Sequence, residues 1–212
     1  METTAALKKM ADAGDARAHF NLGYRLAFGR SRPRPTDWPA VTAHWQVAAE
    51  AGHARAQFYL GVCCEHGQGV PRDMTAALAW WEKAAENGHG VAAHNLAFSY
   101  RVGDGVPQND GLMLHWLEKA VKLGDPDAQR DLGVCYHTGR GVTVDDVKAV
   151  FWYRKAAAGG DRKAMYNLGL CYAAGDGVAA SPRWARFWFG RAAALGHRTA
   201  RARLRRMGNM GE

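Results

Sequence analysis

The stretch that decides the fold runs from Ala54 to His89, ARAQFYLGVCCEHGQGVPRDMTAALAWWEKAAENGH. Its framework returns along the chain, because a glycine recurs every 36 residues, at Gly52, Gly88, Gly124, Gly160 and Gly196. Eight residues after the first four of these glycines come Leu60, Leu96, Leu132 and Leu168. Twenty residues after each leucine come Trp80, Trp116, Trp152 and Trp188. Several independent columns that hold one period indicate a repeat protein.

The period sets the expected organisation, which is a single repeat domain over 1–212. We expect a half-repeat at 4–15, full repeats at 16–53, 54–89, 90–125, 126–161 and 162–197, and a capping helix at 198–210. The first full repeat is two residues longer than the others, and its loop at 30–35 absorbs the difference.

Each repeat predicts two helices, called helix A and helix B. In helix A, Ala56, Tyr59, Leu60 and Cys63 share one face at helical spacing. Helix A ends at a Gly-x-Gly-Val loop, as at Gly67, because glycine supplies the positive φ that a helix end needs. Four residues past the second glycine of the loop comes a column of expected N-caps for helix B: Asp73, Asn109, Asp145 and Ser181, with Asp37 in the first repeat.

Small and large residues alternate in register along the repeats. Alanines such as Ala56 and Ala84 let two helices approach closely, and the tryptophan and leucine columns fill the remaining space. One helix pair cannot bury its apolar face alone, so neighbouring pairs must stack. The sequence therefore predicts an all-α fold, a right-handed α/α superhelix (solenoid) of about five stacked repeats.

The pattern Ala56-x3-Leu60-Gly61-x2-Cys64-x2-Gly67-x-Gly69-Val70, followed by Asp73, Ala77, Trp80 and Lys83-Ala84-Ala85, closely resembles the Sel-one-like repeat, a relative of the tetratricopeptide repeat. The resemblance covers roughly residues 5–207. It implies an α-solenoid that acts as a protein-binding adaptor or scaffold, of the kind found in bacterial envelope biogenesis, signalling and host interaction. Some bacterial members of this family are immunity proteins that neutralise a toxin.

A cysteine-rich branch of the family clips each helix pair with a disulfide, and this chain departs from it. Cys63, Cys135 and Cys171 occupy one column in different repeats. Equivalent positions of stacked helices lie about 10 Å apart, beyond the roughly 7 Å Cα separation that a disulfide tolerates. We therefore expect reduced thiols and a cytoplasmic protein, which agrees with the absence of a signal-peptide pattern at Met1.

The net charge of +8 is concentrated at one end of the chain. Residues 1–176 carry 20 basic and 19 acidic side chains, whereas residues 177–212 carry eight arginines and one acid. Arginine suits the polar outer face of a terminal helix, and the alternative is charge-driven binding of nucleic acid, a membrane surface or an acidic partner. Nucleic acid is the disfavoured partner, and no apolar run approaches the roughly 20 residues that span a bilayer.

Catalytic chemistry and cofactors are not expected. His53, His89 and His197 stand where Asp15, Asp125 and Asp161 stand in other units, which indicates a helix-entry role. The remaining histidines lack metal-ligand spacing. The Gly-x-Gly loops follow helices and recur in every repeat, unlike a phosphate-binding loop after a strand. No nucleophile motif appears, so the sequence predicts a non-enzymatic protein without a metal or cofactor.

Helices A of solenoids usually line an extended binding groove. The ligand-facing positions of the related tetratricopeptide repeats, carried over by alignment, imply a partner-binding set: Arg17, Phe20, Tyr24, Arg55, Phe58, Glu65, His66, His94, Phe98, Arg101, Arg130, His137, Lys163 and Tyr166. Phe28 belongs to the same positions. For Val62, Phe98, Val134 and Leu170, packing against the next repeat is the alternative.

The expected function is recognition of a protein or peptide in this groove by a protein that we expect to be a monomer. Arginine forks bind carboxylates, so we expect an acidic peptide, or one ending in a free carboxylate, held by Arg101 and Arg130. The alternatives are a dedicated inhibitor, such as an immunity protein that binds one folded partner, and charge-driven nucleic-acid binding through the arginine-rich terminal helix.

Overall fold

A computed structural model describes residues 3–29 and 36–209 of the chain. The loop 30–35, expected to absorb the extra length of the first repeat, lies outside the described residues. The described residues form twelve α-helices and contain no strand: α1 (Thr4–Asp12), α2 (Ala16–Phe28), α3 (Trp38–Glu50), α4 (Ala54–His66), α5 (Met74–Glu86), α6 (Gly90–Val102), α7 (Asp110–Lys122), α8 (Pro126–Thr138), α9 (Asp146–Ala158), α10 (Arg162–Ala174), α11 (Pro182–Ala194) and α12 (Arg198–Asn209). The all-α repeat fold predicted from the sequence is confirmed.

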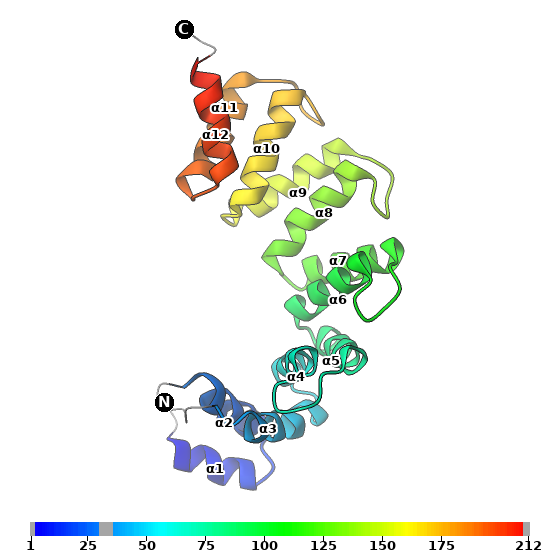
Figure 1. Ribbon diagram of the computed structural model, residues 1–212, viewed down its shortest axis with the longest axis vertical. Coiled ribbons are helices and arrows are strands. Elements are labelled where there is room, and N and C mark those ends of the chain that lie inside the picture. Colours follow the sequence, from blue (N-terminus) through cyan, green and yellow to red (C-terminus); the bar gives the residue numbers. More distant parts are fainter. Residues whose placement is uncertain (1–2, 30–35, 210–212) are drawn as a thin grey trace. The chain divides into compact units, whose positions relative to one another are not determined.

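The chain forms two compact units, an N-terminal unit (Met1–Asn109) with α1 to α6 and a C-terminal unit (Asp110–Glu212) with α7 to α12. Within each unit, every helix packs beside the next one along the chain (Figure 1). Helices A are α2, α4, α6, α8 and α10, and helices B are α3, α5, α7, α9 and α11.

The helix ends follow the predicted capping chemistry. The side chains of Asp37, Asp73, Asp145 and Ser181 each accept a hydrogen bond from a backbone N–H in the first turn of helix B. Gly67 ends α4 in the left-handed conformation with φ of 69°, which a residue with a side chain rarely adopts. The residues of each Gly-x-Gly loop therefore fix where helix A stops.

The residues that open helices A also act as predicted. Asp15, Asp125 and Asp161 cap α2, α8 and α10 with a carboxylate oxygen. His53, His89 and His197 do the same with the ring, since Nδ1 of each lies 3.2–3.3 Å from the backbone nitrogen three residues on. The helix-entry role of these three histidines is confirmed.

The side chain after each residue of the tryptophan column is more buried than the tryptophan itself, although Trp116 is also buried, at 7% exposure. Trp81, Tyr153 and Phe189 are at most 2% exposed, whereas Trp80, Trp152 and Trp188 are only half-buried. Gly61 explains the choice, because a Cβ at this position would lie 2.5 Å from Cδ1 of Trp81. In four of the five repeats a glycine after the repeat leucine thus makes room for a ring on helix B, whereas the third repeat pairs Ala97 with the smaller Leu117.

All four cysteines are buried and none forms a disulfide: Cys63, Cys64, Cys135 and Cys171. Burial raises the pKa of Cys63 to about 12 and that of Cys171 to about 11, because the thiolate loses its hydration inside the core. These thiols are packing residues of the helix pairs.

Candidate protein-binding surfaces

The positions two residues before the repeat leucine belong to contacts between successive repeats. Phe20 stacks on His53 with ring centroids 4.5 Å apart, Phe58 on His89 at 4.4 Å, and Tyr166 on His197 at 4.5 Å. In each pair the histidine is the N-cap of the next helix A or of α12. A side chain held in this way by the following repeat is less available to a partner.

The same column holds an ion pair where the cap is an aspartate. Nη1 of Arg130 donates to Oδ2 of Asp161 at 2.7 Å, and the carboxylate of Asp161 also caps α10. Aromatic residues are therefore matched with histidine caps and arginine with an aspartate cap. This matching gives four of the predicted partner-binding residues, Phe20, Phe58, Arg130 and Tyr166, a structural role that the sequence analysis did not assign.

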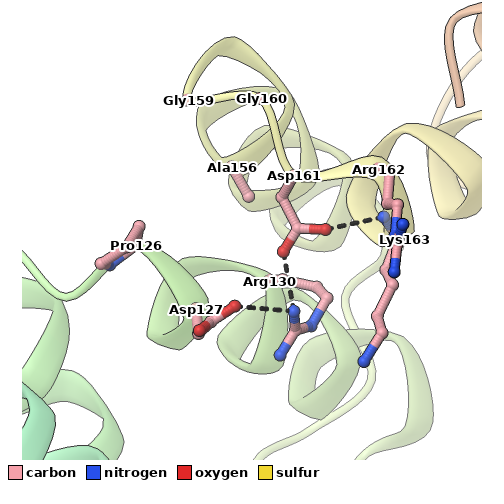
Figure 2. A pocket seen from close by; sticks show the side chains of 9 residues that line it. All are labelled: Pro126, Asp127, Arg130, Ala156, Gly159, Gly160, Asp161, Arg162 and Lys163. Carbon is pink, nitrogen blue, oxygen red and sulfur yellow. Dashed lines mark hydrogen bonds and ion pairs between the residues drawn. The ribbon is translucent and has the colours of Figure 1, made fainter. Parts of the chain in front are cut away.

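Arg130 lies in a pocket of about 390 Å³ between α8, the end of α9 and the start of α10. Figure 2 shows its guanidinium pointing toward Asp127 and Asp161, while Lys163 extends beside it. A third carboxylate, that of Asp131, lies 2.8 Å from Nη2. The Arg130 side chain is only 13% exposed, so its charge is already compensated inside the chain.

The electrostatics of this pocket do not favour an acidic ligand. Burial acts to lower the pKa of Arg130, but Asp131, Asp161 and Asp127 outweigh it and raise that pKa above its ordinary value. The N–H groups of the Arg130 guanidinium already bond these three carboxylates. The geometry of Arg130 therefore does not support the expectation that it binds a carboxylate of a partner.

An exposed aromatic surface lies on α2 and α4 of the N-terminal unit. Tyr24 and Phe28 are 38% and 45% exposed, and their rings meet edge to face at 5.0 Å. Both touch Tyr59 of α4, at 6.0 and 5.8 Å. Arg55 is exposed and lies over the rings of Phe20 and Tyr24, at 4.9 and 5.8 Å. We call Tyr24, Phe28, Arg55 and Tyr59 the α2–α4 surface.

Three residues of the α2–α4 surface were predicted from the sequence to face a partner, and the fourth, Tyr59, was not. Tyr24, Arg55 and Phe28 were expected to face a ligand, whereas Tyr59 was assigned to the packed face of helix A. Tyr59 is half-buried and joins the rings of α2 to Trp45 beneath, at 4.9 Å. Its position beside Phe58, in a run of two aromatic residues, is the signal that could have placed it here. Arg17 is exposed on α2.

A second small pocket, of about 240 Å³, lies between α4 and α6 in the same unit. Three predicted residues line it: Glu65, His66 and Phe98. Glu65 and His66 are neighbours whose side chains lie 3.5 Å apart, and Phe98 is 49% exposed with Arg101 over its ring at 4.9 Å. These contacts bring the four residues together.

The other predicted residues are placed as follows. His94 is half-buried on α6. His137 lies on α8, where its Nδ1 is 2.6 Å from a carboxylate oxygen of Asp146, and Lys163 is exposed at the edge of the Arg130 pocket. Within residues 3–29 and 36–209, no three histidine, cysteine or acidic side chains gather in a way that could hold a metal ion. No helix of this described part is long and apolar enough to cross a membrane.

Stacked pairs of capped helices with matched contacts between repeats define an α-solenoid repeat protein. The family model described as "Sel1 repeat" matches residues 16–37, 54–89, 90–125, 126–161 and 162–197. The chain therefore belongs to the Sel1-repeat family, as the resemblance implied. Repeats of this family generally serve as scaffolds that bind other proteins.

Solved structures of bacterial proteins share the fold. A protective antigen of uropathogenic Escherichia coli with an SLR fold superposes with a TM-score of 0.94 at 32% identity, over 100% of this chain and 45% of that one. A Sel1 repeat protein from Oxalobacter formigenes gives 0.83 at 31% identity, over 95% of this chain and 80% of that one. An immunity protein from Pseudomonas aeruginosa superposes with a TM-score of 0.53 at 26% identity, over 87% of this chain and 66% of that one.

The chain thus spans less than half of the Escherichia coli antigen that it matches. No curated protein matches the chain.

Proposed function

We propose that the chain is a non-enzymatic adaptor that binds a protein or peptide through the surface of its helices A, and that the α2–α4 surface is its main contact in the N-terminal unit. The observation that carries this proposal is the exposure of Tyr24 and Phe28 beside Arg55. Aromatic side chains and arginine are the residue types that dominate the binding energy of protein interfaces.

The α2–α4 surface is held in place before a partner arrives. The ring of Tyr59 supports both Tyr24 and Phe28 from α4, and its own position is fixed by Trp45. A preformed aromatic contact loses little side-chain entropy on binding. The surface is therefore suited to recognition without a conformational change.

Arg55 gives this surface a preference for acidic groups. No carboxylate in the described part of the chain pairs with it, and its Cζ lies 4.9 Å from the ring centroid of Phe20 and 5.8 Å from that of Tyr24. The hydrogen-bond donors at the edge of the guanidinium are left for a partner, and their planar fork suits a carboxylate. The carboxylate-binding role was first assigned to Arg101 and Arg130, and in place of Arg130 we assign it to Arg55.

The test compares two double variants in the capture of a native partner. Tyr24→Ala with Arg55→Ala removes the centre of the surface, while Val47→Ala with Lys83→Ala removes an exposed apolar side chain and a cation from helices B of the same unit. Partners captured by the unaltered chain from its own cells are identified and titrated. We expect the first variant to bind at least about tenfold more weakly, as for two hot-spot residues, and the control to bind normally. Equal loss in both variants, or in neither, would contradict the proposal.

A second candidate function is inhibition of one folded partner. The similarity to an immunity protein at 26% identity favours it. Such an inhibitor binds a single protein at fixed stoichiometry and abolishes its activity, whereas an adaptor leaves its partners active. Measuring the activity of a purified captured partner with and without the chain separates the two functions.

The proposal places the chain in the cytoplasm. The four buried cysteines form no disulfide, which supports a reducing compartment, because disulfides form and persist mainly in oxidising compartments. Fractionation of cells that produce the natural protein would test this placement, and recovery from a periplasmic or culture-medium fraction would contradict it.

A further inference from the structure

A second aromatic surface lies in the C-terminal unit, around α11. Trp184 and Phe187 are 47% and 44% exposed, and their rings meet edge to face at 5.3 Å. The ring of Trp184 lies 6.1 Å from that of Tyr172 on α10, whose hydroxyl accepts a hydrogen bond of 2.7 Å from Arg154 on α9. The guanidinium of Arg191 lies 6.0 Å from the Phe187 ring. We call these five residues the α11 cluster.

Arginine is concentrated on α11 and on α12, which packs against it. Eight arginines lie on α11 and α12, all exposed: Arg183, Arg186, Arg191, Arg198, Arg201, Arg203, Arg205 and Arg206. The sequence has no aspartate or glutamate between Gly177 and Gly211. In the part of the chain that the structure describes, none of the eight arginines forms an ion pair, and Arg186 instead donates to the backbone oxygen of Met207.

The need for a polar helix surface does not explain this charge. The first helix, α1, presents a mixed exposed surface with Lys8, Lys9 and Asp12. On α12, Leu204 and Met207 pack on the core, so the arginines stand on the remaining faces. Because like charges repel each other, eight arginines without an acid cost stability unless a partner compensates them.

We infer that the α11 cluster is a docking surface for a protein segment that carries acidic and apolar side chains on one face. The cluster has an apolar centre, Trp184 and Phe187, and a cationic rim, Arg154 and Arg191, beside which Arg183 is exposed directly before Trp184 on α11. This is the anatomy of a protein interface, whose apolar centre is desolvated and whose rim is polar. The inference rests on the proposed function only in taking the partner to be a protein, and it concerns residues of the other unit.

The rim explains why arginine is used rather than lysine. A guanidinium binds a carboxylate with two parallel hydrogen bonds and also lies against aromatic rings, as Arg191 does with Phe187. Aliphatic Leu195 at the end of α11 is 48% exposed and extends the apolar centre. A nucleic acid would find stacking faces here but would gain little from an aliphatic side chain, which favours a protein.

The experiment measures binding of a defined probe to the full chain. The probe is a fluorescent helical peptide with glutamate and leucine on one face, followed by fluorescence anisotropy. Trp184→Ala with Phe187→Ala removes the centre, and Arg183→Ala with Arg191→Ala, the rim variant, removes the rim cation on α11 and the arginine beside it. The matched control, Leu112→Ala with Lys119→Ala, removes an apolar side chain and a cation from α7, a helix B without arginine.

The two α11 variants should each bind the peptide at least about tenfold more weakly than the unaltered chain, while the control stays within about twofold. Raising the salt from about 0.05 M to about 0.3 M should weaken binding to the unaltered chain, and should matter less for the rim variant. Because the four α11 side chains and Leu112 are exposed and Lys119 is only half-buried, each variant should keep a cooperative unfolding transition, which is measured for every variant.

Three results would overturn the inference. The first is that the peptide does not bind the unaltered chain, and the second is that the α11 variants bind as the control does. The third is that a thymidine oligonucleotide or a phosphatidylserine vesicle binds the unaltered chain more tightly than the peptide does, and that the same substitutions abolish this binding. None of these results bears on the α2–α4 surface, whose test uses other residues and another partner.

Discussion

The matched pairs between repeats can be exchanged, and the exchange tests whether pairing decides the residue type. In the fifth repeat, Tyr166 stacks on His197, and in the fourth repeat the same positions hold Arg130 and Asp161. We consider three variants: Arg130→Tyr, Asp161→His and the double variant that copies the fifth repeat into the fourth. Each single variant mismatches the pair, and the double variant restores a match.

The structure sets the expected costs. Arg130→Tyr removes a cation that is 13% exposed and leaves the carboxylate of Asp161, also 13% exposed, without it. Breaking a fully buried ion pair costs about 3–5 kcal/mol, so this partly buried one should cost about 2–3 kcal/mol. Asp161→His loses the 2.7 Å charge-assisted bond, worth about 1.5–3 kcal/mol, but keeps a cap of the His197 type.

The double variant should be less destabilised than the two single costs together. A stacked aromatic pair is worth about 0.5–1.5 kcal/mol beyond its burial, and the mismatch penalties disappear. We expect a coupling energy of at least about 1 kcal/mol, which exceeds the roughly 0.5 kcal/mol scatter of independent sites.

The assay is urea unfolding at neutral pH followed by far-UV circular dichroism, with the four proteins compared in one double-mutant cycle. The control cycle combines Asp161→His with Lys148→Ala, because Lys148 is exposed and pairs with Asp145 rather than with Asp161. Additive costs in the Arg130–Asp161 cycle would refute the pairing rule, and Arg130 would then return to the candidates for partner binding.

Three further predictions concern packing, pH and thiol reactivity. Gly61→Ala should destabilise the chain by about 1–3 kcal/mol, because the added methyl group overpacks against Trp81. Trp81→Leu should relieve most of that clash, since the third repeat combines Ala97 with Leu117 at the equivalent positions. Burial lowers the pKa of His53 and His197 below 6.5, so unfolding free energy should fall as pH falls from about 7 to about 5.5, since the unfolded chain takes up these protons first. Cys63, whose pKa is about 12, should resist iodoacetamide at neutral pH until the chain unfolds.

Each of these three predictions has a measurement that can contradict it. If Gly61→Ala lowers the unfolding free energy of the Trp81→Leu variant as much as that of the unaltered chain, the clash does not involve Trp81. For the pH effect, His53→Asn should cap α4 without titrating, and a pH profile unchanged by this substitution would refute the assignment to His53. Mass spectrometry after labelling locates the alkylated cysteines, and a modified Cys63 in the folded chain would contradict its buried position.

Much of the fold could be predicted because periodicity and capping are local properties. The glycines at 36-residue spacing fixed the repeat, and Asp73 or Ser181 marked the start of a helix by its side-chain chemistry alone. The sequence does not show which of Trp80 and Trp81 is the more buried, because the two residues are adjacent and equally apolar. Only the close approach of Trp81 to Gly61 separates them, and that contact joins two helices.

The candidate site was predicted less well, since partner-facing positions were carried over from a related repeat. That register does not contain the N-cap residue of the next helix A, so it could not show that Phe58 stacks on His89 or that Arg130 pairs with Asp161. Tyr24 and Arg55 lie beside each other on one exposed surface, and their role in binding a partner stays a prediction. The α11 cluster was missed because its residues lie on helix B and α10, outside the positions assigned to a ligand.

The central claim is that the chain binds proteins through exposed aromatic and arginine side chains of the α2–α4 surface. Isothermal titration of the purified native partner against the unaltered chain and Tyr24→Ala with Arg55→Ala tests it most directly, with Val47→Ala and Lys83→Ala as the control. The account predicts at least about tenfold weaker binding for the surface variant alone. Affinities that are the same for all three proteins, with each variant folded, would contradict it.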